Sequence, residues 1–164
     1  MSNGVLRDLT IKEVALTNLI AAGLTARDIA HTSSAYSSTE AARKAIEYLL
    51  RKTGAGHRLQ LTAWATAAKT VPGPVRESKA LTSTPTIPPR MLEILQGWAD
   101  GLATEEIRHG LGTAQNSMET YIRTLQVHLD VDSPEQAVVV AVLAGLVHVA
   151  LPGAPLPAAL GSAP

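Results

Sequence analysis

The sequence of 164 residues contains no cysteine and no phenylalanine, and aromatic residues make up only 3% of it. Without cysteine, the chain can form neither disulfide bonds nor thiolate metal sites. Hydrophobic residues nevertheless make up 46% of the sequence, so a core built mainly from Ala, Leu, Val and Ile is available. Such a core suits helices better than a sheet. The composition therefore favours an all-α protein.

Signals for export, membrane insertion, metal binding and catalysis are also missing. The N-terminus has no basic segment followed by an apolar run, so we expect a cytoplasmic protein without a signal peptide. The apolar run over residues 137–151 is shorter than the roughly 18 to 20 residues that a membrane span needs. The histidines are scattered, and no nucleophile–base pair or glycine-rich phosphate loop stands out. We therefore expect no membrane association, no metal or cofactor and no enzymatic activity.

Charge is distributed unevenly along a chain whose net charge is zero. Residues 1–80 hold 11 Lys and Arg against 6 Asp and Glu, whereas residues 81–164 hold 3 against 8. The first half therefore carries +5 and the second half −5. Such asymmetry predicts a basic half that contacts an anionic partner and an acidic half with another role.

Capping signals predict three helices in the first half, and apolar spacing predicts a fourth. Hydroxyl residues followed three positions later by an acidic residue are typical helix starts. The pairs are Thr10 with Glu13, Thr25 with Asp28, and Ser37 with Glu40. They begin helices expected over residues 11–22, from residue 25 to a turn at residues 32–39, and from that turn to about residue 53. A fourth helix is expected over residues 57–69.

A proline-rich stretch then gives way to an altered copy of the same pattern. At an offset of 78 residues, Gly101-Leu102 aligns with Gly23-Leu24. Ser133 with Gln136 marks the start of a last helix, expected to reach about residue 150. The sequence thus predicts two tandem four-helix units with a linker between them and a disordered tail. Their bounds are 8–70 for the first unit, 71–89 for the linker, 90–151 for the second unit and 152–164 for the tail.

Both units resemble the DNA-binding domain of the LuxR/GerE family. That family has an apolar helix ending in Ala-x-Gly-Leu, then Ser-x-x-Glu-Ile-Ala, a turn, a recognition helix and a fourth helix. The matching segments here are residues 21–30 and 52–61 in the first unit, and residues 99–107, Leu111, 129–131 and 136–138 in the second. The resemblance implies a helix-turn-helix fold whose third helix enters the major groove and whose fourth helix forms the dimer contact. We expect no sensor or receiver domain beside the two units.

The two units depart from the family pattern in different ways. The first has about two extra residues in its turn. The second has Ala103 in place of a capping hydroxyl residue and Arg108 in place of alanine. Its third helix carries Glu119 and a single basic residue, Arg123. We therefore expect the second unit to be the poorer DNA reader and to serve packing or partner binding.

The third helix of the first unit holds the candidate base contacts. Arg43 and Lys44 match the chemistry of guanine O6 and N7, and Glu40 or Glu47 that of cytosine N4. Around them we expect phosphate and backbone contacts. The full predicted interface is Thr25, Arg27, Ser38, Thr39, Glu40, Arg43, Lys44, Glu47, Arg51, Lys52 and Arg58. The alternative interpretation of this face is a solvated side of an amphipathic helix.

The last helix is apolar almost all round and should be buried. Following the resemblance, its predicted dimerisation residues are Val138, Val142, Gly145, Leu146 and Val149. The same helix could instead pack on the first unit at Leu61, Trp64 and Ala68, or only within the second unit. The sequence leaves these three possibilities open.

The resemblance implies a small bacterial transcriptional regulator, associated with the nucleoid, that binds double-stranded DNA as a homodimer. In this prediction the first unit reads the major groove and the second unit dimerises. One alternative is a protein-interaction module or anti-regulator that no longer binds DNA and captures another regulator through its acidic half. In a further alternative, both units bind one DNA as a pseudo-dimer within a single chain.

Overall fold

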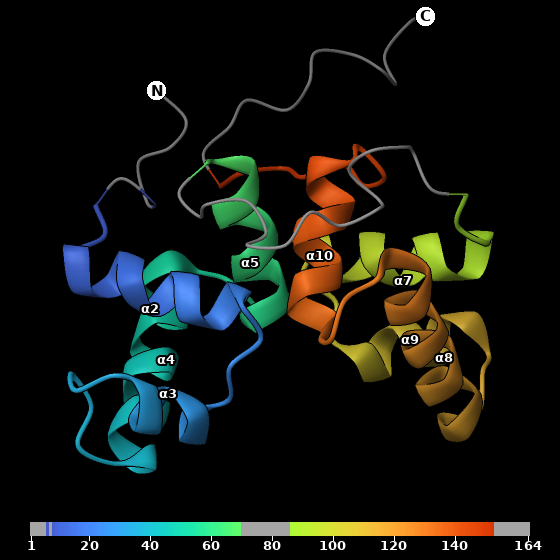
Figure 1. Ribbon diagram of the computed structural model, residues 1–164. Coiled ribbons are helices and arrows are strands. Elements are labelled where there is room, and N and C mark those ends of the chain that lie inside the picture. Colours follow the sequence, from blue (N-terminus) through green and yellow to red (C-terminus); the bar gives the residue numbers. More distant parts are fainter. Residues whose placement is uncertain (1–5, 7, 70–85, 153–164) are drawn as a thin grey trace, which may run out of the picture.

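The computed structural model describes residues 6, 8–69 and 86–152, and every regular element in these ranges is an α-helix (Figure 1). The all-α prediction is confirmed for this part of the chain. The first half contains α2 (Ile11–Ala21), α3 (Ala26–Thr32), α4 (Thr39–Thr53) and α5 (Arg58–Ala67). The second half contains α7 (Pro89–Ala99), α8 (Thr104–Leu111), α9 (Gln115–Leu129) and α10 (Pro134–Leu143). Residues 71–85 of the predicted linker and 153–164 of the predicted tail lie outside the described residues.

Most helices begin where their capping residues predict. Thr10 and Thr25 each form both hydrogen bonds of a capping box, and the Ser133 hydroxyl accepts from the Gln136 N–H at 3.2 Å. One start was predicted wrongly. Ser38, not Ser37, caps α4, because its hydroxyl accepts a hydrogen bond from the Ala41 N–H at 3.1 Å. A capping oxygen reaches the third residue of the helix, so the cap must directly precede Thr39.

The last helix ends earlier than its apolar sequence predicts. α10 stops at Leu143, and Gly145 adopts a left-handed conformation with φ +72°. The Leu146 N–H then donates to the Ala141 carbonyl at 2.9 Å, which closes the helix end. In the first half Lys69 occupies the matching position after α5, also with positive φ (+58°). The apolar residues beyond Gly145 therefore pack as an irregular segment rather than as a helix.

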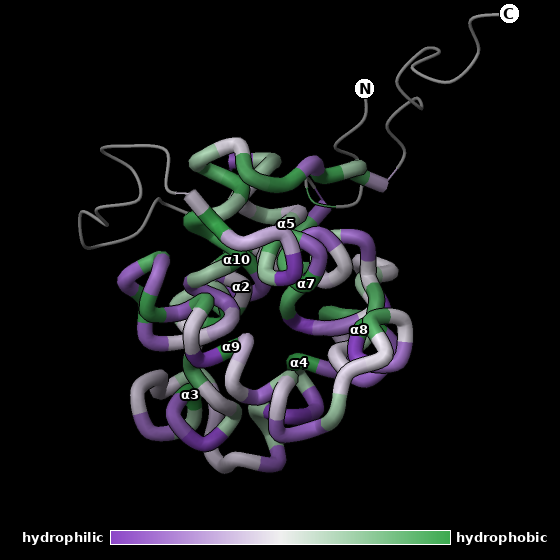
Figure 2. The backbone as a smooth tube through the Cα atoms, turned by 90° about the vertical axis from the view of Figure 1, so that its right-hand side faces the viewer, coloured by the Kyte–Doolittle hydropathy of each residue, from purple (hydrophilic) through white to green (hydrophobic). Residues whose placement is uncertain are grey.

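Two hydrophobic cores meet at α5 and α10. The first core joins α2, α3, α4 and α5 through residues such as Ile20, Ile29 and Leu49, and Leu61 of α5 belongs to it. The second joins α7, α8, α9 and α10, and Ala63 of α5 belongs to that one. Figure 2 shows the hydrophobic segments gathered around α5, α7 and α10, with more hydrophilic segments around α3 and α8. Because α5 contributes to both cores, the halves share one packed centre.

Candidate nucleic-acid interface

The two halves are joined by their fourth helices, α5 and α10, which pack side by side at the centre of the molecule (Figure 1). Ala63 of α5 lies in the same buried cluster as Val138 and Ala141 of α10. Val149, beyond the end of α10, packs against the core that contains Trp64. The fourth helix of the second half thus packs on the first half and on its own half at once.

This packing uses the residues that were predicted to meet a symmetry mate. Val138 is only 1% exposed, so its side chain is not available to a second chain. Val142, Leu146 and Val149 are partly buried against the same intramolecular core, and Gly145 has no side chain to contribute. The side chains expected to form the dimer contact are thus wholly or partly covered inside the chain. The apolar pattern of α10 indicated burial but did not identify the surface that covers it.

Each fourth helix also contacts the turn that precedes the second helix of the other half, α3 or α8. The Gln136 side chain donates to the Ala22 carbonyl at 3.1 Å, and His57 Nε2 lies 2.7 Å from the Leu102 carbonyl oxygen. The Gln60 N–H donates to His57 Nδ1 at 3.1 Å, so Nδ1 is an acceptor. The proton of the neutral ring therefore lies on Nε2, which donates a hydrogen bond to the Leu102 carbonyl. Each half thus contributes a fourth helix to one of these contacts and a turn to the other.

Two glycines allow the turns to approach the fourth helices this closely. Gly23 and Gly101 have φ +89° and +92°, in the left-handed region. A Cβ on Gly23 would lie 2.3 Å from Ser133 Oγ, and a Cβ on Gly101 would lie 2.6 Å from Gln60 Nε2. The turn of each half thus lies against the start of the other half's fourth helix. The contacts between the halves are thus reciprocal at these two turns.

Two of the residues predicted to contact phosphate, Arg58 and Lys52, form hydrogen bonds and ion pairs within the chain. Arg58 donates through Nη2 to the Leu24 carbonyl and forms an ion pair with Glu135 of α10 at 3.4 Å. Lys52 donates to Glu13 Oε1 of α2 at 2.7 Å. This bond lowers the pKa of Glu13 and raises the pKa of Lys52. Neither cation is positioned to meet phosphate without giving up its present partner.

Two predicted hydroxyl contacts are engaged in caps, and a third is half-buried. The Thr25 hydroxyl donates to Asp28 Oδ2 at 2.7 Å and accepts from the Asp28 N–H. The bond from the hydroxyl and a second one from the Thr25 N–H to Oδ2 lower the pKa of Asp28. The Ser38 hydroxyl caps α4, as described above. Thr39, the first residue of α4, is only partly exposed. Their local role is to start helices α3 and α4.

The remaining predicted residues gather on the exposed side of α3 and α4. They are Arg27, Glu40, Arg43, Lys44, Glu47 and Arg51, all exposed. Arg43 Nη1 contacts Glu40 Oε2 at 2.8 Å, but both side chains are more than half exposed. Such a pair contributes little and can exchange partners at small cost. Tyr48, 57% exposed on the same helix, is a further accessible side chain that the sequence reasoning missed.

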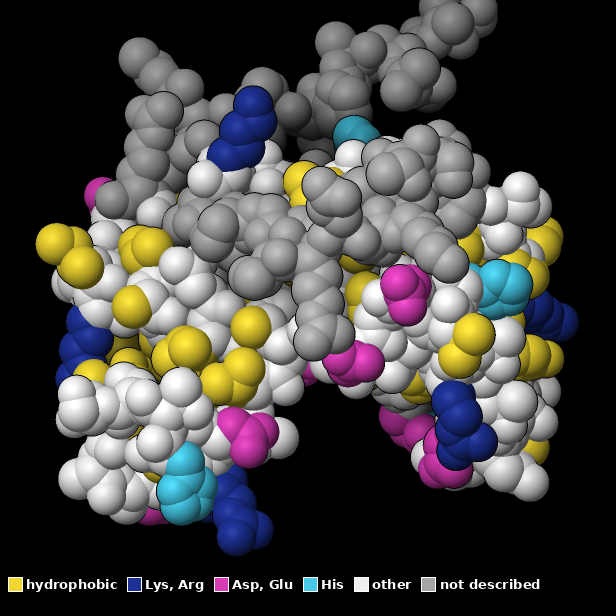
Figure 3. Space-filling view, viewed as in Figure 1, with side chains coloured by type: hydrophobic (Ala, Val, Ile, Leu, Met, Phe, Trp, Pro, Cys, Tyr) yellow, Lys and Arg dark blue, Asp and Glu magenta, His cyan; other side chains and the backbone are white. Residues whose placement is uncertain are grey.

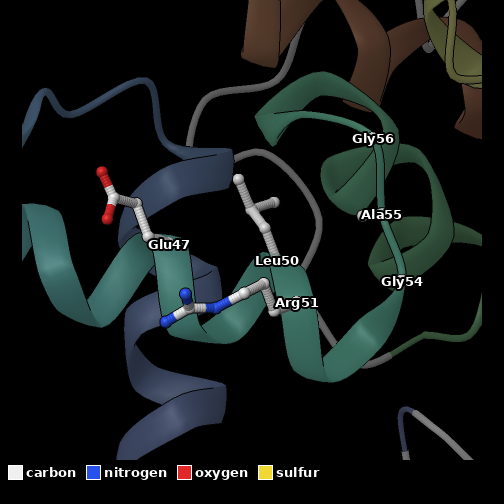
Figure 4. Close-up of a pocket in the computed structure, with 6 residues that line it drawn as sticks. All are labelled: Glu47, Leu50, Arg51, Gly54, Ala55 and Gly56. Carbon is white, nitrogen blue, oxygen red and sulfur yellow. The ribbon is translucent and has the colours of Figure 1, made fainter.

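A shallow hollow of about 450 Å³ extends this surface towards the end of α4 (Figure 4). Glu47, Leu50 and Arg51 project from α4 on one side, and residues 54–56 form the other side. Gly56 in this wall lies close to the Gly101 carbonyl oxygen of the second half. The hollow is open to solvent, so it suits contact with a large molecule better than enclosure of a small one.

The second half presents a polar surface on α9. Its exposed residues are Gln115, Asn116, Ser117, Glu119, Thr120, Arg123, Val127 and His128. Sequence reasoning weighed only Glu119 and Arg123 and missed the amide and hydroxyl side chains at the start of the helix. Figure 3 shows the surface hollowed between the lobe of α3 and α4 and the lobe of α8 and α9, with charged side chains on both lobes.

No protein-family model, curated protein or solved structure matches this chain. Within residues 8–69 and 86–152, no three His, Asp or Glu side chains come together in a way that could hold a metal ion. None of the described helices combines the length and the apolar character needed to cross a bilayer.

Proposed function

We propose that the protein is a small bacterial DNA-binding transcriptional regulator built from two helix-turn-helix units of the LuxR/GerE type. In this proposal α2–α5 form the first unit and α7–α10 the second, and α4 enters the major groove of duplex DNA. The observation that carries it is the exposed, cation-bearing face of α4. That face lies clear of the α5–α10 contact and is held from behind by Ala42, Ile46 and Leu49.

The chemistry of the face fits an anionic double helix. Arg27, Lys44 and Arg51 are exposed, and no ion pair or hydrogen bond engages their side chains within the described part of the chain. Three such cations can each neutralise a phosphate. Arg43 is held only by an exposed ion pair and can exchange Glu40 for the O6 and N7 atoms of guanine.

A single chain supplies both units in this proposal. The fourth helices, which the family resemblance assigns to the dimer contact, already pack against each other within the chain. The intramolecular pseudo-dimer therefore replaces the homodimer as the preferred arrangement. We accordingly expect the protein to remain monomeric in solution and to bind duplex DNA as one chain.

A salt titration of binding to duplex DNA tests the proposal. Affinity should fall steeply with salt, and each lost phosphate contact should reduce the log–log slope by about 0.9. The variant Arg43→Gln with Lys44→Gln should bind weakly and show a shallower slope. The matched control is Lys12→Gln with Lys69→Gln, which removes the same charge away from α4 and should behave like the wild type.

The second candidate function is binding of another protein through the acidic half. It is favoured by Glu105 and Glu106, which are exposed at the start of α8 and would repel phosphate. Glu105 is paired with Arg108, which lowers the pKa of Glu105 and offsets part of its charge. Absence of binding to any duplex at about 50 mM salt would favour this candidate over DNA binding.

A further inference from the structure

The third helices of the two halves hold the same place in the order of helices. α4 and α9 both have 15 residues, and Thr39 corresponds to Gln115 at an offset of 76. Both helices end at a left-handed residue, Gly54 with φ +78° and Asp130 with φ +54°. The fourth helix that follows each one contacts the turn of the opposite half. α4 and α9 therefore correspond in length, in their ends and in the helix that follows each of them.

Burial along the two helices follows the same register. Ala42 and Leu49 of α4 are buried, and so are Met118 and Leu125 at the matching positions of α9. Five exposed positions of α4 are likewise exposed in α9. The pairs are Glu40 with Asn116, Arg43 with Glu119, Lys44 with Thr120, Glu47 with Arg123, and Arg51 with Val127. The two helices present the same face but carry different side chains on it.

The chemistry of the two faces differs in kind. α4 offers the charged groups of Arg43 and Lys44, which match the acceptors of guanine. α9 offers the amides of Gln115 and Asn116, which match the donor and acceptor of adenine at N6 and N7. The Asn116 side chain makes no hydrogen bond within the described residues, and that of Gln115 is held only by Glu119 at 3.3 Å. Both amides are available to a base edge.

We propose that α9 is a second reading helix, so that one chain recognises an asymmetric duplex with two unlike half-sites. This inference rests on the proposed function and deepens it. The α4 half-site contains guanine, and the α9 half-site contains adenine. The two half-sites lie on one face of the duplex, about 10 base pairs apart from centre to centre. The target is therefore not an inverted repeat.

The first experiment selects bound duplexes from a random pool with the full chain. The expected consensus has two different blocks, and native mass spectrometry should find one chain per duplex. The variant Gln115→Ala with Asn116→Ala should lose the preference in the adenine-containing block only, with a loss of affinity of about tenfold to hundredfold. Arg43→Ala with Lys44→Ala should lose it in the other block. His128→Ala, exposed at the far end of α9, is the matched control and should leave both blocks intact.

The outcomes distinguish failure of base reading by α9 from failure of DNA binding itself. If the wild type binds no duplex at low salt, the proposed function fails. If the wild type binds but selects a single block, and the Gln115 and Asn116 substitutions change nothing, the second reading helix is refuted while DNA binding stands. An inverted repeat occupied by two chains also refutes it. Each variant should unfold at the same temperature as the wild type in a thermal scan. A loss of sequence selection is then not explained by a loss of folding.

A spacer experiment tests that both helices engage the same duplex. Inserting 5 base pairs between the selected blocks rotates one half-site by about half a turn around the duplex. Binding should then fall to the level of a duplex that carries only one block. Undiminished binding would mean that the blocks are read by separate chains, and the single-chain arrangement would be wrong.

Discussion

Substitution of Gly23 by alanine should destabilise the protein through the contact between its halves. Gly23 has φ +89°, and this region costs a non-glycine residue about 1–2 kcal/mol. The new Cβ would also lie 2.3 Å from Oγ and 2.7 Å from Cβ of Ser133. The Oγ can rotate away only by giving up its capping bond to the Gln136 N–H, and the Cβ is fixed to the backbone. Displacing Ser133 removes the cap of α10, worth about 1 kcal/mol. We expect the free energy of unfolding to fall by about 2–3 kcal/mol.

Urea unfolding of matched variants separates the two contributions. Gly54→Ala is the control for conformation alone, because Gly54 has φ +78° and nothing lies within 4 Å of a Cβ placed there. That variant should lose only about 1–2 kcal/mol. In the wild-type background Ser133→Gly should lower the free energy of unfolding by only about 0.3 kcal/mol, because glycine is tolerated at a helix cap. In the Gly23→Ala background the same change removes the overlap and should raise stability.

The effect of Ser133→Gly in the Gly23→Ala background tests whether the start of α10 lies against the turn after α2. If Gly23→Ala loses no more stability than Gly54→Ala, and Ser133→Gly does not restore it, the start of α10 does not lie against the turn after α2. The pairing of α5 with α10 inside one chain would then be wrong, and with it the intramolecular pseudo-dimer.

Two further predictions concern ion pairs that tie helices together. Because the Lys52 bond depresses the pKa of Glu13, the ionised carboxylate stabilises the fold at pH above its ordinary value of about 4.3, and this contribution is lost as the pH falls through the lowered pKa. Glu13→Gln should therefore be less stable than the wild type in urea at pH 7, and the difference should close as the pH falls through the lowered pKa of Glu13; a constant difference, or an equal effect of Glu47→Gln, would contradict this. Glu135→Gln should lower the free energy of unfolding by up to about 1 kcal/mol, because its pair with Arg58 is only partly buried. A loss above about 3 kcal/mol in urea would instead indicate a fully desolvated pair, and Glu119→Gln serves as the exposed control.

Local features of the fold could be predicted from the sequence because their causes are local. The caps at Thr10, Thr25 and Ser133 are formed by residues three positions apart, and such spacing is visible in the chain. The end of α10 was missed because the apolar run continues past Gly145. The hydrophobic pattern carries no information about where a helix stops, whereas the single glycine does.

The candidate site was predictable in its charges but not in its partners. Arg58 and Lys52 are conspicuous cations, yet their acceptors are 34 and 39 residues away at Leu24 and Glu13. No periodicity reveals such long-range choices. One sequence feature could have indicated the contact between the halves. Gln60 and Gln136 occupy the third position of the two fourth helices, and both face the opposite half.

The contact between the halves is itself asymmetric, and this favours a chain that pairs with itself over one that pairs with a copy. At the offset of 76 residues, Arg58 corresponds to Pro134 and Leu59 to Glu135. In a symmetric dimer of first halves, Arg58 would meet Leu59 where it now meets a carboxylate, and a partly buried cation would lose its ion-pair partner.

A symmetric dimer of second halves would bring Glu135 against Pro134 and leave an unpaired carboxylate at the same place. Only unlike halves complete the pair, so the ion pair disfavours both symmetric alternatives. Within one chain, no single sequence has to serve both sides of the contact, and in the proposed complex none has to serve both half-sites of the DNA. Divergence of the faces of α4 and α9 is therefore permitted by the same asymmetry that pairs Arg58 with Glu135.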